Sequence, residues 1–171
     1  KQHLELARDI AQQRINSRFS KDNNPILKVP KPLILKEGAK IMSLCDGKNK
    51  MSKSDPNENS RIGLLDDPDA IQKKIKKAKT DPHFGLEFSN PERPESDNLL
   101  GIYSMVTNQS REKVAEEFSK IGWGKFKPLL TDAVITSLQP IQQKYNDLIK
   151  DPSELNRILK EGTNNAKTLS G

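Results

Sequence analysis

The sequence predicts a mostly α-helical chain, in which the end of an α/β domain precedes an α-helical bundle. Residues 1–60 alternate helical, extended and loop patterns, whereas apolar residues in 66–171 recur at spacings of three and four. The length of 171 residues suits one ordinary domain, or one domain and a small piece of another. The boundary is expected in the loop around Asp55-Pro56-Asn57.

The first 60 residues contain one clear helical pattern. An apolar stripe predicts a helix from residue 4 to near residue 20. Residues 26–35 are expected to be extended, because prolines in and beside this segment disfavour a helix. Residues 41–44 are apolar and predict a short buried strand after Gly38. A polar loop follows over residues 46–60.

The second part has helix signals in a regular series. Pro68 at the first position of a helix, after an aspartate, is a typical start. Ser96 and Ser110 are expected to cap the next two helices. A long helix is predicted over about 127–149, with a kink or break at Pro140. A last helix is predicted to start after Asp151, run through Leu159 and end at Gly162.

Composition excludes several classes of protein. The single cysteine, Cys45, cannot form an internal disulfide and fits a reducing, cytoplasmic compartment. No stretch approaches the roughly 20 apolar residues of a membrane helix. Residues 1–80 hold 18 Lys and Arg against 10 Asp and Glu, a net charge of +8, whereas residues 81–171 carry −2. The basic half is where a phosphate-rich partner would be attracted.

The string Lys50-Met51-Ser52-Lys53-Ser54 is the most informative feature. Two lysines three residues apart, with two hydroxyls and free backbone N–H groups, suit a polyphosphate. The glycines of a rigid phosphate loop are absent, so this loop is expected to move onto its ligand. The alternative interpretation is a solvated Lys/Ser loop without function, but the full five-residue string favours a functional one.

This string resembles the KMSKS signature of class I aminoacyl-tRNA synthetases. Its extension to Asn57 is similar to the version in bacterial-type tryptophanyl-tRNA synthetases. Further similar segments occur in order along the chain: residues 1–6, 8–9, 38–44, 64–67, 73–76, 80–81, 98–100 and 140–142. The related tyrosyl enzymes are a weaker match. A stand-alone RNA-binding helical module is the second alternative.

The resemblance implies a tryptophan–tRNA ligase that uses ATP to form tryptophanyl-adenylate and transfers tryptophan to tRNA(Trp). Lys50 and Lys53 would be catalytic and hold the β- and γ-phosphates. Ser52 and Ser54 would add hydrogen bonds to ATP. Met51 would pack near the adenine and anchor the loop. Ile41 would line the adenine pocket.

The resemblance also assigns the two parts of the chain. Residues 1–60 would be the carboxy-terminal part of a Rossmann-type catalytic domain with the KMSKS loop, and residues 66–171 a helical domain on the tRNA anticodon side. Mg²⁺ would be bound through the ATP phosphates, without a protein metal site. The full protein is expected to be a cytoplasmic homodimer with no membrane partner. The first signature of the family and its tryptophan pocket are missing, so this chain is expected to be part of the enzyme and inactive alone.

Overall fold

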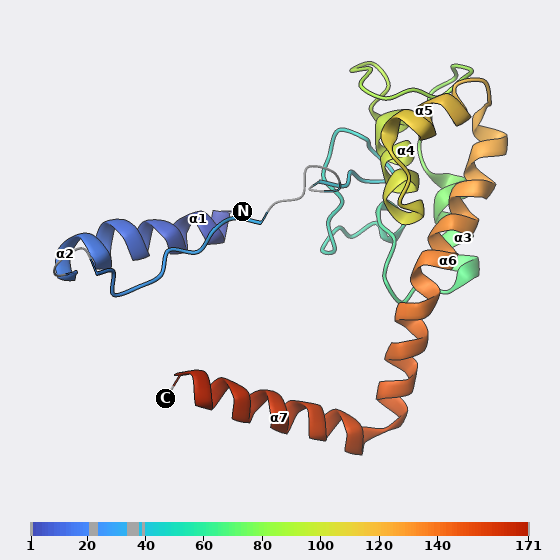
Figure 1. Cartoon of the computed structure of the whole chain (residues 1–171). Coiled ribbons are helices and arrows are strands. Elements are labelled where there is room, and N and C mark those ends of the chain that lie inside the picture. The colour runs from blue at the N-terminus through green and yellow to red at the C-terminus, as the bar shows by residue number, and fades with distance from the viewer. Residues whose placement is uncertain (1, 21–23, 34–37, 39, 171) are drawn as a thin grey trace. The chain divides into compact units, whose positions relative to one another are not determined.

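The computed structural model describes residues 2–20, 24–33, 38 and 40–170 and divides into two compact units, Lys1–Ala39 and Lys40–Gly171 (Figure 1). The helical elements are α1 (Gln2–Asp9), η1 (Ile10–Asn16), α2 (Ser17–Phe19), η2 (Glu58–Ser60), α3 (Pro68–Lys77), α4 (Pro94–Thr107), α5 (Arg111–Phe118), α6 (Trp123–Lys150) and α7 (Pro152–Ser170). The prediction of a mostly helical chain is confirmed.

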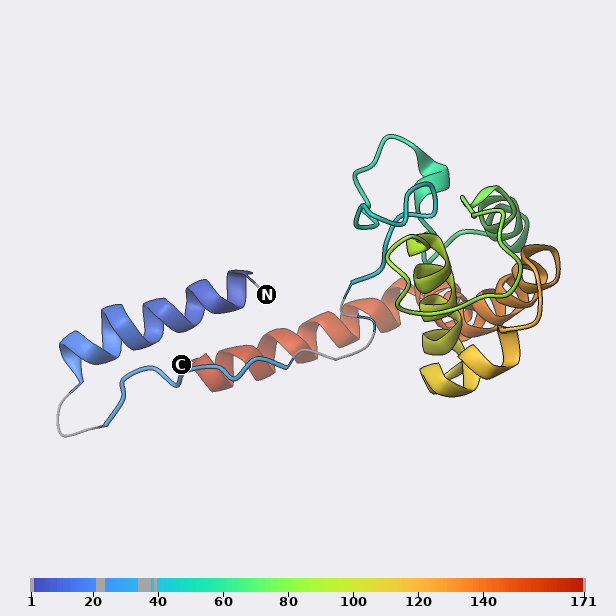
Figure 2. The same ribbon diagram turned by 90° about the horizontal axis from the view of Figure 1, so that it is seen from above.

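The first unit is a helix with an extended segment alongside it. α1, η1 and α2 follow one another without interruption, with π-helical geometry in η1, which confirms the predicted first helix. Asn16 joins the two segments, because its carboxamide donates to the Leu27 carbonyl at 2.7 Å and accepts from the Leu27 amide at 2.8 Å. Arg8 donates to the Pro30 carbonyl. Residues 26–33 are non-helical, as predicted, and run back along the helix (Figure 2); 34 and 35 lie outside the described residues.

The second unit has its hydrophobic core between α3, α4, α5 and α6. Three aromatic rings lie at its centre. Phe118 packs edge-on against Tyr103, with ring centroids 4.8 Å apart, and against Phe126 at 4.9 Å. Ile75 from α3 and Leu130 from α6 are fully buried in the same cluster. The predicted helical bundle is therefore present, and its core is continuous across all four helices.

Helix starts follow the predicted capping chemistry at three of four positions, including Asp151, which accepts a hydrogen bond from the Glu154 amide at 3.2 Å at the start of α7. Asp67 accepts a hydrogen bond from the Ala70 amide at 2.7 Å and caps α3, and Ser110 caps α5. The prediction that Ser96 caps the next helix is wrong, because α4 already begins at Pro94. The Ser96 hydroxyl instead bonds the Glu87 amide at 3.0 Å and the Glu87 carbonyl at 2.8 Å. It thereby ties α4 to the preceding loop.

The long helix ends at Lys150, close to its predicted end, but the break considered at Pro140 is absent and the end predicted at Gly162 is wrong. α6 continues through Pro140 without a break. Pro140 is exposed, so the backbone carbonyl that loses its partner can be solvated. α7 continues through Gly162 to Ser170. One glycine costs about 1 kcal/mol in a helix, and Arg157 offsets part of this through 2.7 Å ion pairs along the same helix with Glu154 and Glu161.

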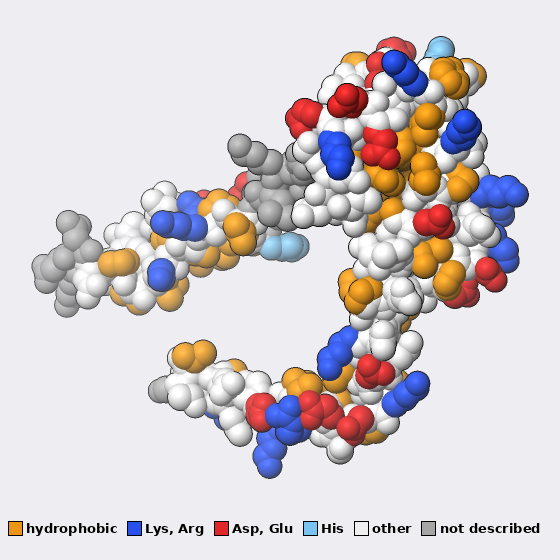
Figure 3. Space-filling view, turned by 45° about the vertical axis from the view of Figure 1, so that its right-hand side comes forward, with side chains coloured by type: hydrophobic (Ala, Val, Ile, Leu, Met, Phe, Trp, Pro, Cys, Tyr) orange, Lys and Arg blue, Asp and Glu red, His pale blue; other side chains and the backbone are white. Residues whose placement is uncertain are grey.

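α7 and the end of α6 carry apolar side chains at the surface. None of the residues of α7 is buried. Ile149 of α6 is 56% exposed and Leu159 of α7 is 60% exposed. Figure 3 shows hydrophobic side chains on this face interspersed with charges of both signs. No helix in the described part of the chain combines the length and the apolar composition required to cross a membrane.

The predicted strand at residues 41–44 is not formed. Within residues 40–170, the β-type pairing is an isolated antiparallel bridge between Met42 and Lys50. One short hairpin is too small to build a sheet of its own. Residues 40–66, which the sequence placed largely with the catalytic domain, lie in the same compact unit as the bundle helices. The division into 1–60 and 66–171 remains a functional prediction.

Candidate phosphate-binding site

Residues 41–51 form a tight hairpin that leads into the signature string. The Met51 amide donates to the Ile41 carbonyl at 2.9 Å, and the Ser43 amide donates to the Asn49 carbonyl at 2.8 Å. At the turn, the Asp46 carboxylate accepts from the Lys48 amide at 3.0 Å and from the Asn49 carboxamide at 2.6 Å. These bonds place the apolar segment 41–44 directly beside the first residues of the signature.

The signature residues themselves form an exposed loop. Lys50, Ser52, Lys53 and Ser54 are all exposed. The Ser52 and Ser54 hydroxyls lie 3.1 Å apart, and the Ser54 amide donates to the Ser52 hydroxyl at 3.3 Å. Neither signature lysine has an ion-pair partner among the described residues. Two unpaired ammonium groups beside two hydroxyls form a basic, hydrogen-bonding surface that is open to an anionic ligand.

The other two predicted site residues are half-buried. Ile41 and Met51 face each other across the start of the hairpin and pack against the hydrophobic core. All six predicted residues are thus brought together in one hairpin and its following loop. Their apolar members hold the base in place, while their polar members project from it.

The loop is fixed at its far end as well. The Leu44 amide donates to the carbonyl of the buried Ser60 at 2.9 Å, and Arg61 donates to the Asp55 carbonyl at 2.7 Å. Asn57 accepts from the Asn59 amide at 3.0 Å and starts η2. Both ends of the loop are therefore attached. Lys53 lies on the segment between these attachments, and Lys50 lies at the end of the hairpin, in the bridge with Met42.

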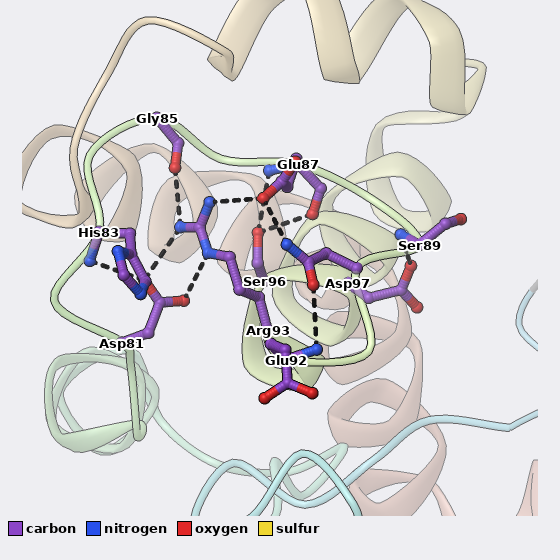
Figure 4. Close-up of polar contacts among 10 residues, drawn as sticks. Asp81, His83, Gly85, Glu87, Ser89, Glu92, Arg93, Ser96 and Asp97 are labelled. Carbon is purple, nitrogen blue, oxygen red and sulfur yellow. Dashed lines mark hydrogen bonds and ion pairs between the residues drawn. The ribbon is translucent and has the colours of Figure 1, made fainter.

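A buried ionic cluster holds the long connection between α3 and α4 (Figure 4). Arg93 is 6% exposed and donates twice to the Asp81 carboxylate, at 3.0 Å each. It also donates to Glu87 at 3.1 Å and to the Gly85 carbonyl at 2.8 Å. Burial raises the pKa of Asp81, but hydrogen bonds from Arg93 and from the His83 amide outweigh it, and the pKa lies below its ordinary value.

Sequence reasoning missed this cluster and one further residue. The prolines and glycine of residues 80–96 indicated a loop, and they contain no signal for an organised ionic centre. The sequence shows only that Arg93 shares this segment with Asp81 and Glu87, and it does not reveal that Arg93 is buried. The other residue, Asn98, lies in α4 and bonds the backbone of Met42 at the hairpin. Nothing in the local sequence pattern relates two positions so far apart.

The family model described as tRNA synthetases class I (W and Y) matches residues 1–139 of the chain. Among curated proteins, a tryptophan–tRNA ligase of Prochlorococcus marinus is 72% identical over 170 residues, which are 99% of this chain and 50% of the relative. The chloroplastic/mitochondrial tryptophan–tRNA ligase of Arabidopsis thaliana is 49% identical, with coverage of 99% and 43%. The chain spans about half the length of the curated relatives it matches.

Solved structures give the same result. Tryptophanyl-tRNA synthetase from Mycoplasma pneumoniae matches with a TM-score of 0.84 and 31% identity, over 98% of this chain and 51% of that one. The Campylobacter jejuni enzyme, complexed with ADP and tryptophan, matches with a TM-score of 0.64 and 26% identity, over 98% and 49%. The predicted resemblance to the tryptophanyl branch is thus confirmed, and the chain belongs to the class I tRNA synthetases for tryptophan and tyrosine.

Proposed function

We propose that the protein containing this chain is a tryptophan–tRNA ligase, which activates L-tryptophan with ATP to tryptophanyl-adenylate and transfers it to tRNA(Trp). The observation that carries the proposal is the signature Lys50-Met51-Ser52-Lys53-Ser54, exposed at the end of an anchored hairpin. The 72% identity to a curated tryptophan–tRNA ligase supports tryptophan rather than tyrosine as the substrate. In the formation of the adenylate, pyrophosphate is the leaving group, and negative charge builds on it as its bond to the α-phosphate breaks.

In this proposal Lys50 and Lys53 hold the β- and γ-phosphates of ATP. Negative charge builds on pyrophosphate as it leaves, so lysines that approach at that moment bind the transition state more strongly than the ground state. A lysine side chain is flexible and can follow this charge, whereas the planar arginine fork is more rigid. Both ammonium groups are exposed on the loop and have no described ion-pair partner that would compete with phosphate.

The remaining signature residues support the nucleotide. Ser52 and Ser54 would donate hydroxyl and backbone hydrogen bonds to the phosphates once their mutual contact opens. Ile41 would line the adenine pocket and Met51 would pack near the adenine, which fits their half-buried places at the base of the hairpin. An apolar base and a polar tip match the two ends of ATP.

The described residues contain no group of three or more His, Cys, Asp or Glu arranged to hold a metal ion. In this proposal Mg²⁺ arrives with ATP and is bound through phosphate oxygens, as is usual for this cation in ATP-dependent enzymes. We assign residues 1–60 to the carboxy-terminal part of a Rossmann-type catalytic domain and residues 66–171 to a helical anticodon-side domain. The complete enzyme is proposed to be a cytoplasmic homodimer that binds ATP, L-tryptophan and tRNA(Trp).

The proposal is tested on the full-length protein by exchange of labelled pyrophosphate into ATP. Exchange is expected with L-tryptophan and not with L-tyrosine at the same concentration. Charging of tRNA(Trp) in the presence of ATP then tests the second step. Exchange that depends on tyrosine would place the protein in the other branch of the family, and no exchange with either amino acid would contradict the enzyme assignment.

Residues 50–59 are expected to exchange amide hydrogens more slowly when ATP binds. Without ligand the two lysines repel each other and the loop between its attachments is free to move. Phosphate removes this repulsion and orders the loop. Hydrogen–deuterium exchange with and without a non-hydrolysable ATP analogue checks this in the full-length protein, with the buried α4 as the internal reference. Protection that is already complete without nucleotide would contradict a loop that closes.

A further inference from the structure

Asn98 of α4 pairs with the backbone of Met42 as a neighbouring strand would. Its carboxamide oxygen accepts from the Met42 amide at 2.9 Å, and its carboxamide nitrogen donates to the Met42 carbonyl at 2.9 Å. Asn98 is 8% exposed, so both bonds are shielded from water. One side chain therefore satisfies both polar backbone groups of a residue 56 positions away.

The residue held by Asn98 lies opposite the signature. Met42 forms the antiparallel bridge with Lys50, the first signature lysine. The next pair along the hairpin joins the Met51 amide to the Ile41 carbonyl at 2.9 Å. A movement of the Met42 backbone is thus transmitted directly to the start of the phosphate-binding loop.

The amino-terminal end of α4 contacts the same hairpin at a second point. A Cβ atom on Gly47 would lie 2.7 Å from the Glu95 backbone nitrogen, so only glycine allows the turn to approach α4 so closely. Glu95 pairs with Lys79 at 2.9 Å, and the Lys79 amide donates to the Leu44 carbonyl at 2.8 Å. The hairpin is therefore attached to α4 at its turn and along its first segment.

We propose that Asn98 is a positioning residue for ATP activation, because it fixes the hairpin from which the signature lysines close on polyphosphate. A two-stranded hairpin is marginally stable alone, and the carboxamide supplies the partner that an adjacent strand would give. With the base held, only the loop beyond Met51 has to move on closure. This inference rests on the proposed function, since it assumes that Lys50 and Lys53 bind phosphate.

The test compares Asn98→Ala with Ser104→Ala in the full-length enzyme. Ser104 lies on the same helix, is 3% exposed and donates one hydrogen bond to the Gln109 carbonyl at 2.7 Å, away from the hairpin. Asn98→Ala is expected to lower kcat/KM for ATP about tenfold in pyrophosphate exchange, with KM for tryptophan within about twofold. Ser104→Ala is expected to keep kcat/KM for ATP and KM for tryptophan within about twofold of the wild type, when the variant is assayed below its unfolding temperature.

Hydrogen exchange without any ligand provides a readout that does not depend on the reaction. Asn98→Ala is expected to accelerate exchange at the Ser43 and Met51 amides, which bond across the hairpin, and Ser104→Ala is not. Gly47→Ala is a second variant and should act in the same direction, because its methyl group displaces the turn from α4.

Three outcomes overturn the inference: equal ATP kinetics in Asn98→Ala and Ser104→Ala, unchanged exchange at both hairpin amides, or an equal loss for tryptophan and ATP. Full activity of a Lys53→Ala enzyme has a different meaning. It would refute the proposed function of the loop, whereas the exchange rates of the two hairpin amides would still report whether Asn98 holds the hairpin.

Discussion

Lys53→Ala is expected to slow tryptophan activation by about 10²–10³-fold in the full-length enzyme, as loss of one transition-state charge contact does. Lys53 is exposed and has no described ion-pair partner, so its removal should leave the fold unchanged. Binding of tryptophan should hardly change, because the resemblance places that pocket outside this chain. Pyrophosphate exchange at saturating tryptophan measures the effect.

Lys48→Ala is the matched control for this variant. Lys48 is also an exposed lysine, but it lies at the turn of the hairpin that precedes the signature. Its replacement removes the same charge from the basic half of the chain and should change the rate within about twofold. Equal losses in the two variants would show that only the net charge of the surface matters. Full activity of Lys53→Ala would refute its assignment.

Lys53→Arg separates charge from flexibility at the same position. Arginine keeps the positive charge, but its planar fork is more rigid than an ammonium group on a four-carbon stem. If the role of Lys53 is to follow pyrophosphate as it leaves, the arginine variant should recover ground-state ATP binding and only part of the rate. The split between KM for ATP and kcat therefore distinguishes binding from transition-state stabilisation.

Capping residues, prolines and apolar periodicity predicted those helices whose ends depend on residues close in the sequence. The cap at Asp67, the proline after it and the apolar stripes identified α3 and the long α6. These signals failed where a distant partner competes, as at Ser96, whose hydroxyl bonds the Glu87 backbone across the loop instead of starting a helix. Gly162 failed as a stop signal because the helix on both sides of it tolerates one unfavourable residue.

In the candidate site as well, the contiguous residues could be predicted from the sequence and the residues from distant positions could not. The signature is a contiguous string, so its residues and their chemistry are readable directly from the sequence. Its support is not contiguous, because Asn98 and Met42 are far apart in the sequence and meet only where α4 contacts the hairpin. The strand expected at 41–44 is a single bridge for a related reason, because a strand is defined by its neighbours and not by its own apolar residues.

Arg93→Met is expected to destabilise the second unit by about 3–5 kcal/mol, because it removes the cation that pairs with Asp81 and leaves this buried carboxylate without an ion-pair partner among the described residues. The side chains of Arg93 and Asp81 are 7% and 10% exposed. Because methionine preserves much of the volume of arginine, the loss of stability should come from the missing charge and not from a cavity. Urea unfolding of the chain, followed by fluorescence of Trp123, measures it, since this tryptophan packs on Phe126 in the core.

Arg157→Met is the control for the loss of one arginine. Arg157 forms ion pairs with Glu154 and Glu161, but all three side chains are more than a third exposed. Solvent screens such pairs, and the replacement of Arg157 should leave the urea midpoint almost unchanged. A similar loss of stability in Arg93→Met and Arg157→Met would mean that the buried ion pairs of Arg93 stabilise the fold no more than exposed ones.

The difference between wild type and Arg93→Met should depend on pH in a defined direction. In the wild type the pKa of Asp81 lies below its ordinary value of 3.8, so its ionised form stabilises the fold above that value, and this contribution is lost as pH falls through the lowered pKa. Without Arg93, burial disfavours the ionised form of Asp81 and raises its pKa. As pH falls, Asp81 is therefore protonated at a higher pH in the variant than in the wild type, and the cost of its buried charge disappears. The difference in unfolding free energy should therefore be largest near neutral pH, begin to narrow above the ordinary pKa of 3.8 as Asp81 of the variant is protonated, and narrow further below it. A difference that stays constant from pH 7 to pH 3 would show that Arg93 contributes through packing and not through the Asp81 carboxylate.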